Sequence, residues 1–286
     1  MLDRMNDRPV SHRVRTRAGE VVVDELGSGP TVLLLPAAAH LRGDWDLVRP
    51  ALAAEFRTIA VDWPGHGDSP APDPGWAATA AGFADVVEDV VDHVRAGDEP
   101  VGLLGNSVGG FAAARFAARR PADAGALVLV DSGGFVPITA LVRAFGAAMG
   151  RPAVLHRIYP WFSRWYMRDA SPFGARVRAA AIATARRPGT TELLSALWRS
   201  FSTPAADVRR EAAAITAPTL AVWGARDPVL PTRVGRIAAD AVPGARMVVL
   251  DTGHVPFASR PDAFTSAVVP FLRAAAAARC GSDRAR

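Results

Sequence analysis

Short apolar runs alternate along the chain with longer amphipathic stretches, and this alternation constrains the fold more than any other feature. Six runs bounded by Gly, Pro or Asp have the pattern of strands buried on both faces: 31–35, 58–61, 101–104, 126–130, 219–223 and 247–250. Stretches of helical character lie between or beside them, at 44–54, 79–95, 108–119, 233–241 and 262–278. Because strand and helix alternate, we predict an α/β fold with a mostly parallel sheet flanked by helices.

Two further strands are expected before residue 31. Arg13, Arg15 and Arg17 alternate with Val14 and Thr16, which is the period-two pattern of a strand with one solvated face. Residues 21–26 form the next apolar stretch and end in the turn-forming sequence Gly-Ser-Gly-Pro. The two stretches predict a hairpin-like edge, so the sheet should have about eight strands and a mixed edge.

The alternation stops between residues 133 and 204, where no convincing strand pattern occurs. We predict a helical cap over 133–204 and a core made of residues 1–132 and 205–286. The cap segment contains ten arginines but only two acids, Asp169 and Glu192, a local balance of +8. It is also rich in aromatic residues, which either line an apolar cavity or pack a small helical subdomain onto the core. The arginines likewise allow two interpretations, attraction of anionic substrates or solvated helix faces.

Composition and charge exclude several classes of function. All 33 basic residues are arginine, so a Schiff-base lysine and a P-loop lysine are absent. The single cysteine, Cys280, excludes internal disulfides and cysteine-rich zinc sites. The net charge is +5, but the basic residues are not concentrated in one run, which argues against a nucleic-acid partner. No window reaches about 18 apolar residues and no signal peptide is evident near Asp3 and Asp7, so we expect a cytoplasmic protein with no membrane partner.

The strongest chemical signal is the sequence Gly105-Asn106-Ser107-Val108-Gly109, at the join between an expected strand and an expected helix. A serine on such a tight turn points its hydroxyl out of the sheet, and small residues two positions away let strand and helix pass closely. The Val108 amide, at the helix N-terminus, can then donate to an oxyanion. We therefore expect Ser107 to be a nucleophile, the alternative being an ordinary helix cap.

A serine nucleophile needs a base and a group that orients the base. His254 follows the run 247–250 and Asp227 follows the run 219–223, so both lie on loops at the carboxyl ends of strands, where α/β sheets bind ligands. Asp131, directly after the run 126–130, competes with Asp227 as the acid, although turn capping also explains it. We favour Asp227. His66 lies in a Gly- and Pro-rich loop and is expected to shape the backbone there.

The order Ser107, Asp227, His254, with an insertion between the sixth and seventh strands, resembles the α/β-hydrolase superfamily with a helical cap. The resemblance runs from about residue 21 to residue 275 and includes the segments 62–69, 223–228 and 253–256. It implies a second oxyanion amide at Ala38, and we expect no cofactor and no metal. The family often has His-Gly-x after the third strand, whereas this chain has Pro-Ala-Ala-Ala-His at 36–40.

These observations predict a serine hydrolase of a small, partly apolar carbonyl substrate, most simply a carboxylic ester, acting as a monomer or homodimer. The expected substrate-binding residues are Trp161, Trp165, Arg168 and Val255. Residues 106–110 also resemble the carbon–carbon bond hydrolases that cleave ring-fission products of aromatic degradation. A non-hydrolytic member of the scaffold, such as a cofactor-free oxygenase, an isomerase or a ligand receptor, is the remaining alternative.

Overall fold

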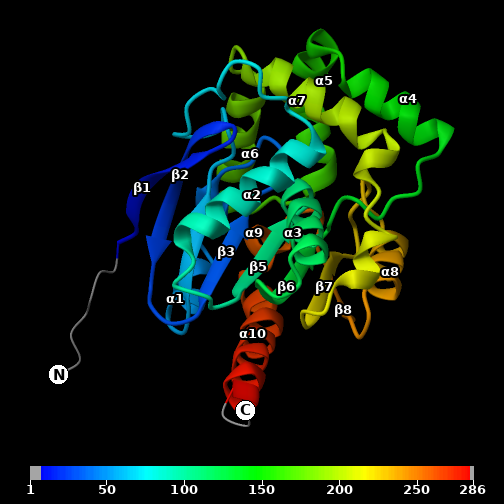
Figure 1. Ribbon diagram of the computed structural model, residues 1–286. Helices are drawn as coiled ribbons and strands as arrows, with labels where there is room; N and C mark the ends of the chain where they lie inside the picture. Colours follow the sequence, from blue (N-terminus) through cyan, green and yellow to red (C-terminus); the bar gives the residue numbers. More distant parts are fainter. Residues whose placement is uncertain (1–7, 284–286) are drawn as a thin grey trace.

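Four strands buried along their whole length form the centre of the sheet (Figure 1). They are β3 (Thr31–Leu35), β5 (Val101–Asn106), β6 (Ala124–Val130) and β7 (Thr219–Gly224), and they pair in parallel in that order. Their near-continuous apolar sequences suit strands that are covered by helices on both faces. The computed structural model describes residues 8–283, so Asp3, Asp7 and the last three residues of the expected core lie outside the described residues.

The remaining strands extend the sheet to eight, in the order β1-β2-β4-β3-β5-β6-β7-β8. They are β1 (Val10–Thr16), β2 (Gly19–Leu26), β4 (Arg57–Val61) and β8 (Arg246–Leu250). β1 and β2 form an antiparallel hairpin, and β2 runs antiparallel to β4. Arg13 and Arg15 are exposed while Val14 and Thr16 are buried. The predicted mixed edge is therefore confirmed.

Two details of the sequence-based prediction are wrong. The run 247–250 is not buried on both faces, because β8 pairs only with β7, lies at the edge of the sheet and is half-buried or exposed along its length. The expected helix over 44–54 is broken into a 3₁₀ turn, η1 (Arg42–Trp45), and a short helix, α1 (Arg49–Ala53). Pro50 lies in the first turn of α1, where its missing N–H is tolerated but would interrupt a helix continuing from residue 44.

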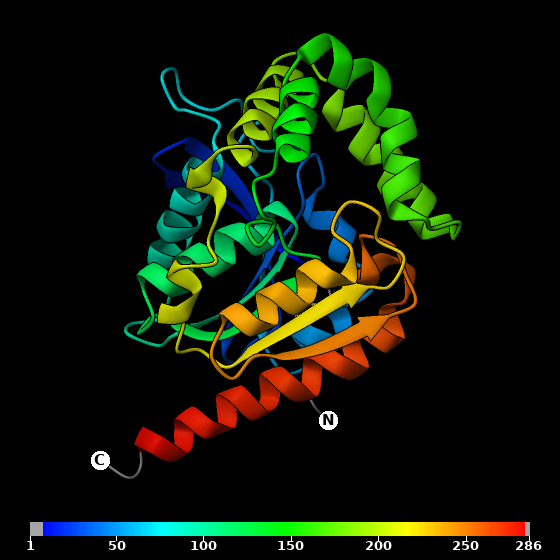
Figure 2. The same ribbon diagram turned by 90° about the vertical axis from the view of Figure 1, so that its right-hand side faces the viewer.

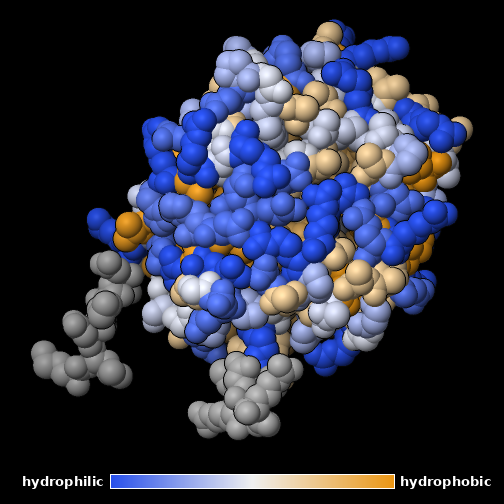
Figure 3. Space-filling view, in the orientation of Figure 1, coloured by the Kyte–Doolittle hydropathy of each residue, from blue (hydrophilic) through white to orange (hydrophobic). Residues whose placement is uncertain are grey.

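Helices cover both faces of the sheet (Figures 1 and 2). The core helices are α2 (Ala80–Val94), α3 (Val108–Arg119), α8 (Thr232–Ala241), α9 (Pro256–Ser259) and α10 (Pro261–Asp283), with short 3₁₀ turns η2 (Pro204–Ala206) and η3 (Glu211–Ala214). α2 packs against α3, α1 packs against α10, and Figure 2 shows α8 and α10 on opposite sides of β7 and β8. The surface over α2 in Figure 3 is predominantly hydrophilic, and Arg17 and Arg119 form ion pairs there with Asp89 (2.7 Å) and Asp85 (3.0 Å).

The helical insertion after β6 is confirmed. It contains α4 (Ala140–Met149), α5 (Pro152–Met167), α6 (Pro172–Ala185) and α7 (Thr190–Phe201), all between β6 and β7. Figures 1 and 2 show these four helices as a layer at one end of the molecule, opposite the end where α10 finishes. Among the described residues, no helix is both long and apolar enough to span a bilayer.

Candidate active site

Ser107 lies on a sharp turn between β5 and α3. Its backbone has φ 54° and ψ −108°, a conformation that few non-glycine residues adopt. A Cβ atom on Gly109 would lie 2.2 Å from the Leu35 carbonyl oxygen, and one on Gly105 would lie 2.3 Å from the Gly109 carbonyl oxygen. Both positions therefore require glycine, as the close passage of strand and helix predicts. The Ser107 side chain makes no capping hydrogen bond, so the helix-cap alternative does not describe this serine.

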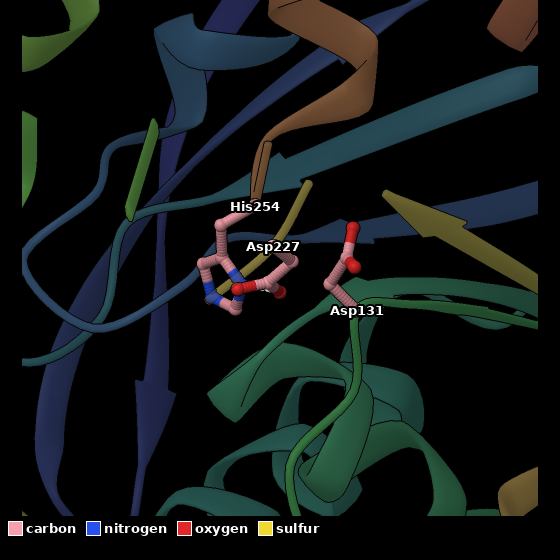
Figure 4. Close-up of side chains that lie close together, drawn as sticks. All are labelled: Asp131, Asp227 and His254. Atoms are coloured by element: carbon pink, nitrogen blue, oxygen red, sulfur yellow. Dashed lines mark hydrogen bonds and ion pairs between the residues drawn. The ribbon is translucent and has the colours of Figure 1, made fainter. Parts of the chain in front are cut away.

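His254 and Asp227 meet at the same edge of the sheet (Figure 4). Nδ1 of His254 lies 2.6 Å from Oδ2 of Asp227, and both side chains are buried. The other carboxylate oxygen, Oδ1 of Asp227, accepts hydrogen bonds from the backbone amides of Val229 (2.8 Å) and Leu230 (3.1 Å). A carboxylate held in this way keeps the proton of a neutral imidazole on Nδ1, so that Nε2 presents its lone pair as a base.

Asp131 lies beside this pair and does not contact the histidine ring. Figure 4 shows the Asp227 carboxylate between His254 and Asp131. Oδ1 of Asp131 accepts the Gly224 amide proton at 2.9 Å, whereas its buried Oδ2 has no partner among the described residues. Complete burial, and then the nearby Asp227 carboxylate, raise the pKa of Asp131 well above its ordinary value. Of the two acids that the sequence proposes, the structure brings Asp227 to His254.

The raised pKa makes a prediction for Asp131→Asn. Because the folded state holds this proton more tightly than the unfolded chain, wild-type stability should fall as pH rises above the unfolded pKa of about 3.9. Asparagine imitates the protonated acid, so the variant should unfold at a urea concentration equal to or above that of the wild type, with its advantage larger at pH 8 than at pH 5. A variant that is equally destabilised at both pH values would contradict the proposed protonation.

The loop after β3 is held by side chains from the loop after β4. The Trp63 indole donates to the Pro36 carbonyl (2.8 Å), and the Ala39 amide donates to Nε2 of His66 (3.2 Å). Burial lowers the pKa of His66 to about 4, so the ring is neutral and Nε2 accepts. Ala39, not Ala38, takes the positive φ of 65° that the missing glycine would have favoured. The hydrogen bond from the Ala39 amide to His66 agrees with the backbone-shaping role expected of His66.

One cluster of possible metal ligands occurs among the described residues. Ligand atoms of Asp131, Asp227 and His254 lie within 4.8 Å of one another. Most of these atoms already have partners, since Nδ1 of His254 bonds Asp227 and three carboxylate oxygens accept hydrogen bonds. The hydrogen bonds account for the cluster without an ion.

The model for the alpha/beta hydrolase family matches residues 32–267. The chain belongs to this family. Similar curated proteins include a pimeloyl-[acyl-carrier protein] methyl ester esterase from Neisseria meningitidis, 29% identical over 242 residues, covering 80% of this chain and 87% of the relative. A 2-hydroxy-6-oxononadienedioate/2-hydroxy-6-oxononatrienedioate hydrolase from Cupriavidus pinatubonensis is 30% identical over 240 residues, covering 79% of each. A hydrolase structure from Pseudomonas aeruginosa superposes with a TM-score of 0.77 at 27% identity, covering 92% of this chain and 98% of that one.

In this α/β-hydrolase, the expected substrate-binding residues lie in different environments. Val255 is buried directly after His254. Trp161 and Trp165 lie on one exposed face of α5, where their rings stack with centroids 6.0 Å apart, and Arg168 is exposed at the C-cap of the same helix. The structure therefore does not bring these three residues to His254.

The opposite face of α5 carries buried aromatic residues that the sequence analysis did not single out. Tyr166 stands edge-on to the His254 ring, with ring centroids 5.4 Å apart, and its carbonyl accepts the His254 amide proton at 3.1 Å. Its hydroxyl lies 2.8 Å from Nε2 of His40, whose Nδ1 bonds Asp44, and 3.1 Å from the Tyr159 hydroxyl. This buried network ties α5 of the helical insertion to the loop after β3. The i, i+4 spacing of His40 and Asp44 could have indicated their contact. Nothing in the sequence connected Tyr166 to His40 or to Asp44.

Asn106 was also missed. Its buried side-chain amide donates to the carbonyls of Val130 and His254, both at 3.0 Å. The residue before the nucleophile thus fixes the backbone of the loop that carries the histidine. Its position inside the Gly-x-Ser-x-Gly sequence was the only available signal.

Proposed function

We propose that this α/β-hydrolase is a serine hydrolase of carboxylic esters, with Ser107 as nucleophile, His254 as base and then acid, and Asp227 as the group that orients the histidine. The observation that supports it most is the Asp227–His254 hydrogen bond of 2.6 Å at the sheet edge where the Ser107 turn lies. The 133–204 segment acts as the cap over this edge. Tyr166 and Met167 of α5 contact the loop that carries His254.

The reaction follows from these positions. Nε2 of His254 takes the hydroxyl proton of Ser107 as Oγ attacks the ester carbonyl, and the backbone amides of Val108 and Ala38 hold the oxyanion. The resulting imidazolium, stabilised by Asp227, gives its proton to the leaving alcohol as the carbon–oxygen bond breaks. Water then attacks the acyl-enzyme, with His254 again as base, and releases the acid and the free serine.

A buried apolar environment beside the histidine favours a partly apolar substrate. Val255 follows His254 and Tyr166 packs against its ring, and Tyr159 and Phe162 contact Tyr166 in turn; all four side chains are buried. Substrate pockets commonly combine such surfaces with a few polar groups that set orientation. The esterase relative from N. meningitidis supports an ester as the substrate class.

Carbon–carbon bond hydrolysis is the second candidate, and one relative favours it. The C. pinatubonensis protein is a hydrolase whose name describes a dienedioate or trienedioate substrate. Asn106-Ser107-Val108-Gly109-Gly110 is the segment on which the sequence resembles that class. The ester remains the first candidate because the chain departs from the glycine-rich loop of carbon–carbon bond hydrolases at 36–40.

A fluorophosphonate probe and a substrate panel test the proposal together. The probe should label the wild-type protein at Ser107 and should not label Ser107→Ala. Short- and medium-chain esters should be hydrolysed faster than ring-fission diketones. Labelling with cleavage of diketones alone would favour the second candidate, and the absence of both labelling and turnover would favour a non-hydrolytic protein.

A further inference from the structure

The outer face of α4 and α5 exposes large apolar side chains. Leu141 is 79% exposed, Trp161 66%, Phe145 39% and Trp165 36%. Phe145 and Trp165 both contact the buried ring of Phe162, each with ring centroids 6.0 Å apart, so the exposed rings are neighbours. We call these four residues, together with Arg157, Arg164 and Arg168, the cap patch.

Two arginines of the cap patch share the helix face of the tryptophans. Residues 157, 161, 164 and 165 are all exposed and recur at the spacing of one helix face. Arginine and tryptophan therefore alternate along about two turns of α5, and the exposed Arg168 follows directly at its C-cap. From residue 133 to residue 168 the chain has five arginines and no acid.

Most of the described core arginines form ion pairs, whereas most of the cap arginines do not. Among the described residues, nine of the ten arginines between 133 and 204 form no ion pair, the exception being Arg176 with Asp46 at 3.6 Å. By contrast, Arg17, Arg119 and Arg120 on the core pair with acids of α2 at 2.7 to 3.0 Å. The cap thus presents positive charge that the described part of the chain does not neutralise.

Tryptophan and arginine beside exposed leucine and phenylalanine are the side chains that settle at the boundary of an anionic bilayer. The indole ring prefers the headgroup level, and guanidinium groups bind lipid phosphates while aliphatic and aromatic side chains enter the acyl region. Two surface hollows, lined by residues 204–210 and by residues of the segments 65–79 and 187–196, include none of the cap patch. The exposed side chains of the cap patch can enter a lipid bilayer, because a fluid bilayer does not need to present a cavity of matching shape.

We propose that the cap patch docks this protein on the surface of anionic lipid bilayers, a partner that the sequence analysis did not expect. Docking leaves the helices in the interface and requires no spanning segment. Figures 1 and 2 show the far end of α10 opposite the cap, so the C-terminal helix does not obstruct the approach. The buried face of α5, with Tyr159 and Tyr166, then separates the lipid from the loop that carries His254.

The test is flotation with vesicles of equal parts phosphatidylglycerol and phosphatidylcholine, compared with pure phosphatidylcholine. The wild-type protein should float with the anionic vesicles at low salt and should not float with the neutral ones. It should be released by 0.5 M NaCl, because the Debye length is then only about 4 Å and exposed charges are screened from the lipid phosphates. Its tryptophan emission should shift to the blue on binding. Trp45, Trp63 and Trp223 are already fully buried and Trp76 and Trp198 are partly buried, so the shift should come mainly from the exposed Trp161 and Trp165.

Two double variants with the same change of charge give the control. Arg157→Gln/Arg164→Gln should lower the vesicle partition coefficient about 25-fold, about fivefold for each arginine. Arg233→Gln/Arg236→Gln removes two exposed, unpaired arginines of α8 and should lower it less than threefold. Trp161→Ala/Trp165→Ala should remove most of the blue shift while leaving the melting temperature within a few degrees, because both side chains are exposed.

Three results would overturn the proposal. They are no flotation of the wild type with anionic vesicles, an equal loss in the α8 variant, and binding of an acidic carrier protein or of a second copy at the cap patch with no binding to vesicles. None of these measurements depends on turnover, so their outcome is independent of the proposed esterase activity.

Discussion

Ser107→Ala is expected to lower kcat for ester hydrolysis by at least about 10⁴-fold, because the variant has no Oγ to form the acyl-enzyme. The fold should persist, since the Ser107 side chain makes no hydrogen bond that holds α3 and the strained backbone is required of either residue. The initial rates of wild type and variant are measured with the best ester of the panel. Each rate is divided by a protein concentration that is determined without active-site labelling.

The folded state of the Ser107→Ala variant is checked by circular dichroism and thermal melting. Any residual turnover should come only from substrate binding and from electrostatic stabilisation of the oxyanion. A folded variant that retains the wild-type rate would remove Ser107 from the mechanism and, with it, the proposed acyl-enzyme.

Asp227→Asn is expected to lower kcat by about 10³- to 10⁴-fold, as the analogous substitution does in serine proteases. The structure gives the reason. The amides of Val229 and Leu230 will keep the side-chain oxygen of asparagine at the Oδ1 position, so its NH₂ group will face Nδ1 of His254. An amide donor there favours the tautomer with the proton on Nε2, and that nitrogen then cannot accept the serine proton.

Asp131→Asn is the matched control for Asp227→Asn. Its oxygen can keep the Gly224 hydrogen bond, and its NH₂ group takes the position of the unpartnered Oδ2 near Asp227. The loss in kcat should stay below the roughly 10²-fold effect of removing a group that transfers a proton. If Asp131→Asn proves the more damaging of the two, the acid belongs after β6 and not after β7.

Much of the core fold could be predicted because each buried strand has a recognisable local sequence pattern. β3, β5, β6 and β7 are continuous apolar runs bounded by Gly, Pro or Asp, and the start and end of α3 match the predicted 108–119. The edge strand β8 was misjudged because its sequence is as apolar as that of a central strand. Whether a strand has one neighbour or two depends on the order of the whole sheet.

Part of the candidate site could also be predicted from the sequence, and part depended on the tertiary structure. Ser107, Asp227 and His254 each follow a strand, so their positions at one sheet edge could be inferred from the chain alone. The sequence favoured Asp227 over Asp131 but could not show which of the two contacts the histidine, because both follow neighbouring strands. That contact depends on which carboxylate the loop after β7 turns toward the histidine, and there the distance of 2.6 Å decides.

The amino-acid sequence by itself determined the α/β architecture, the insertion after the sixth strand, and the three residue types of the candidate triad. These depend on local periodicity and on residues at the ends of strands, which short-range physics controls. Only the tertiary structure decided which face of α5 is buried, which joins Tyr166 to His254 and His40 and leaves Trp161, Trp165 and Arg168 outside. An aromatic helix has the same composition whichever face it buries, and the contacts of the cap with the core select that face.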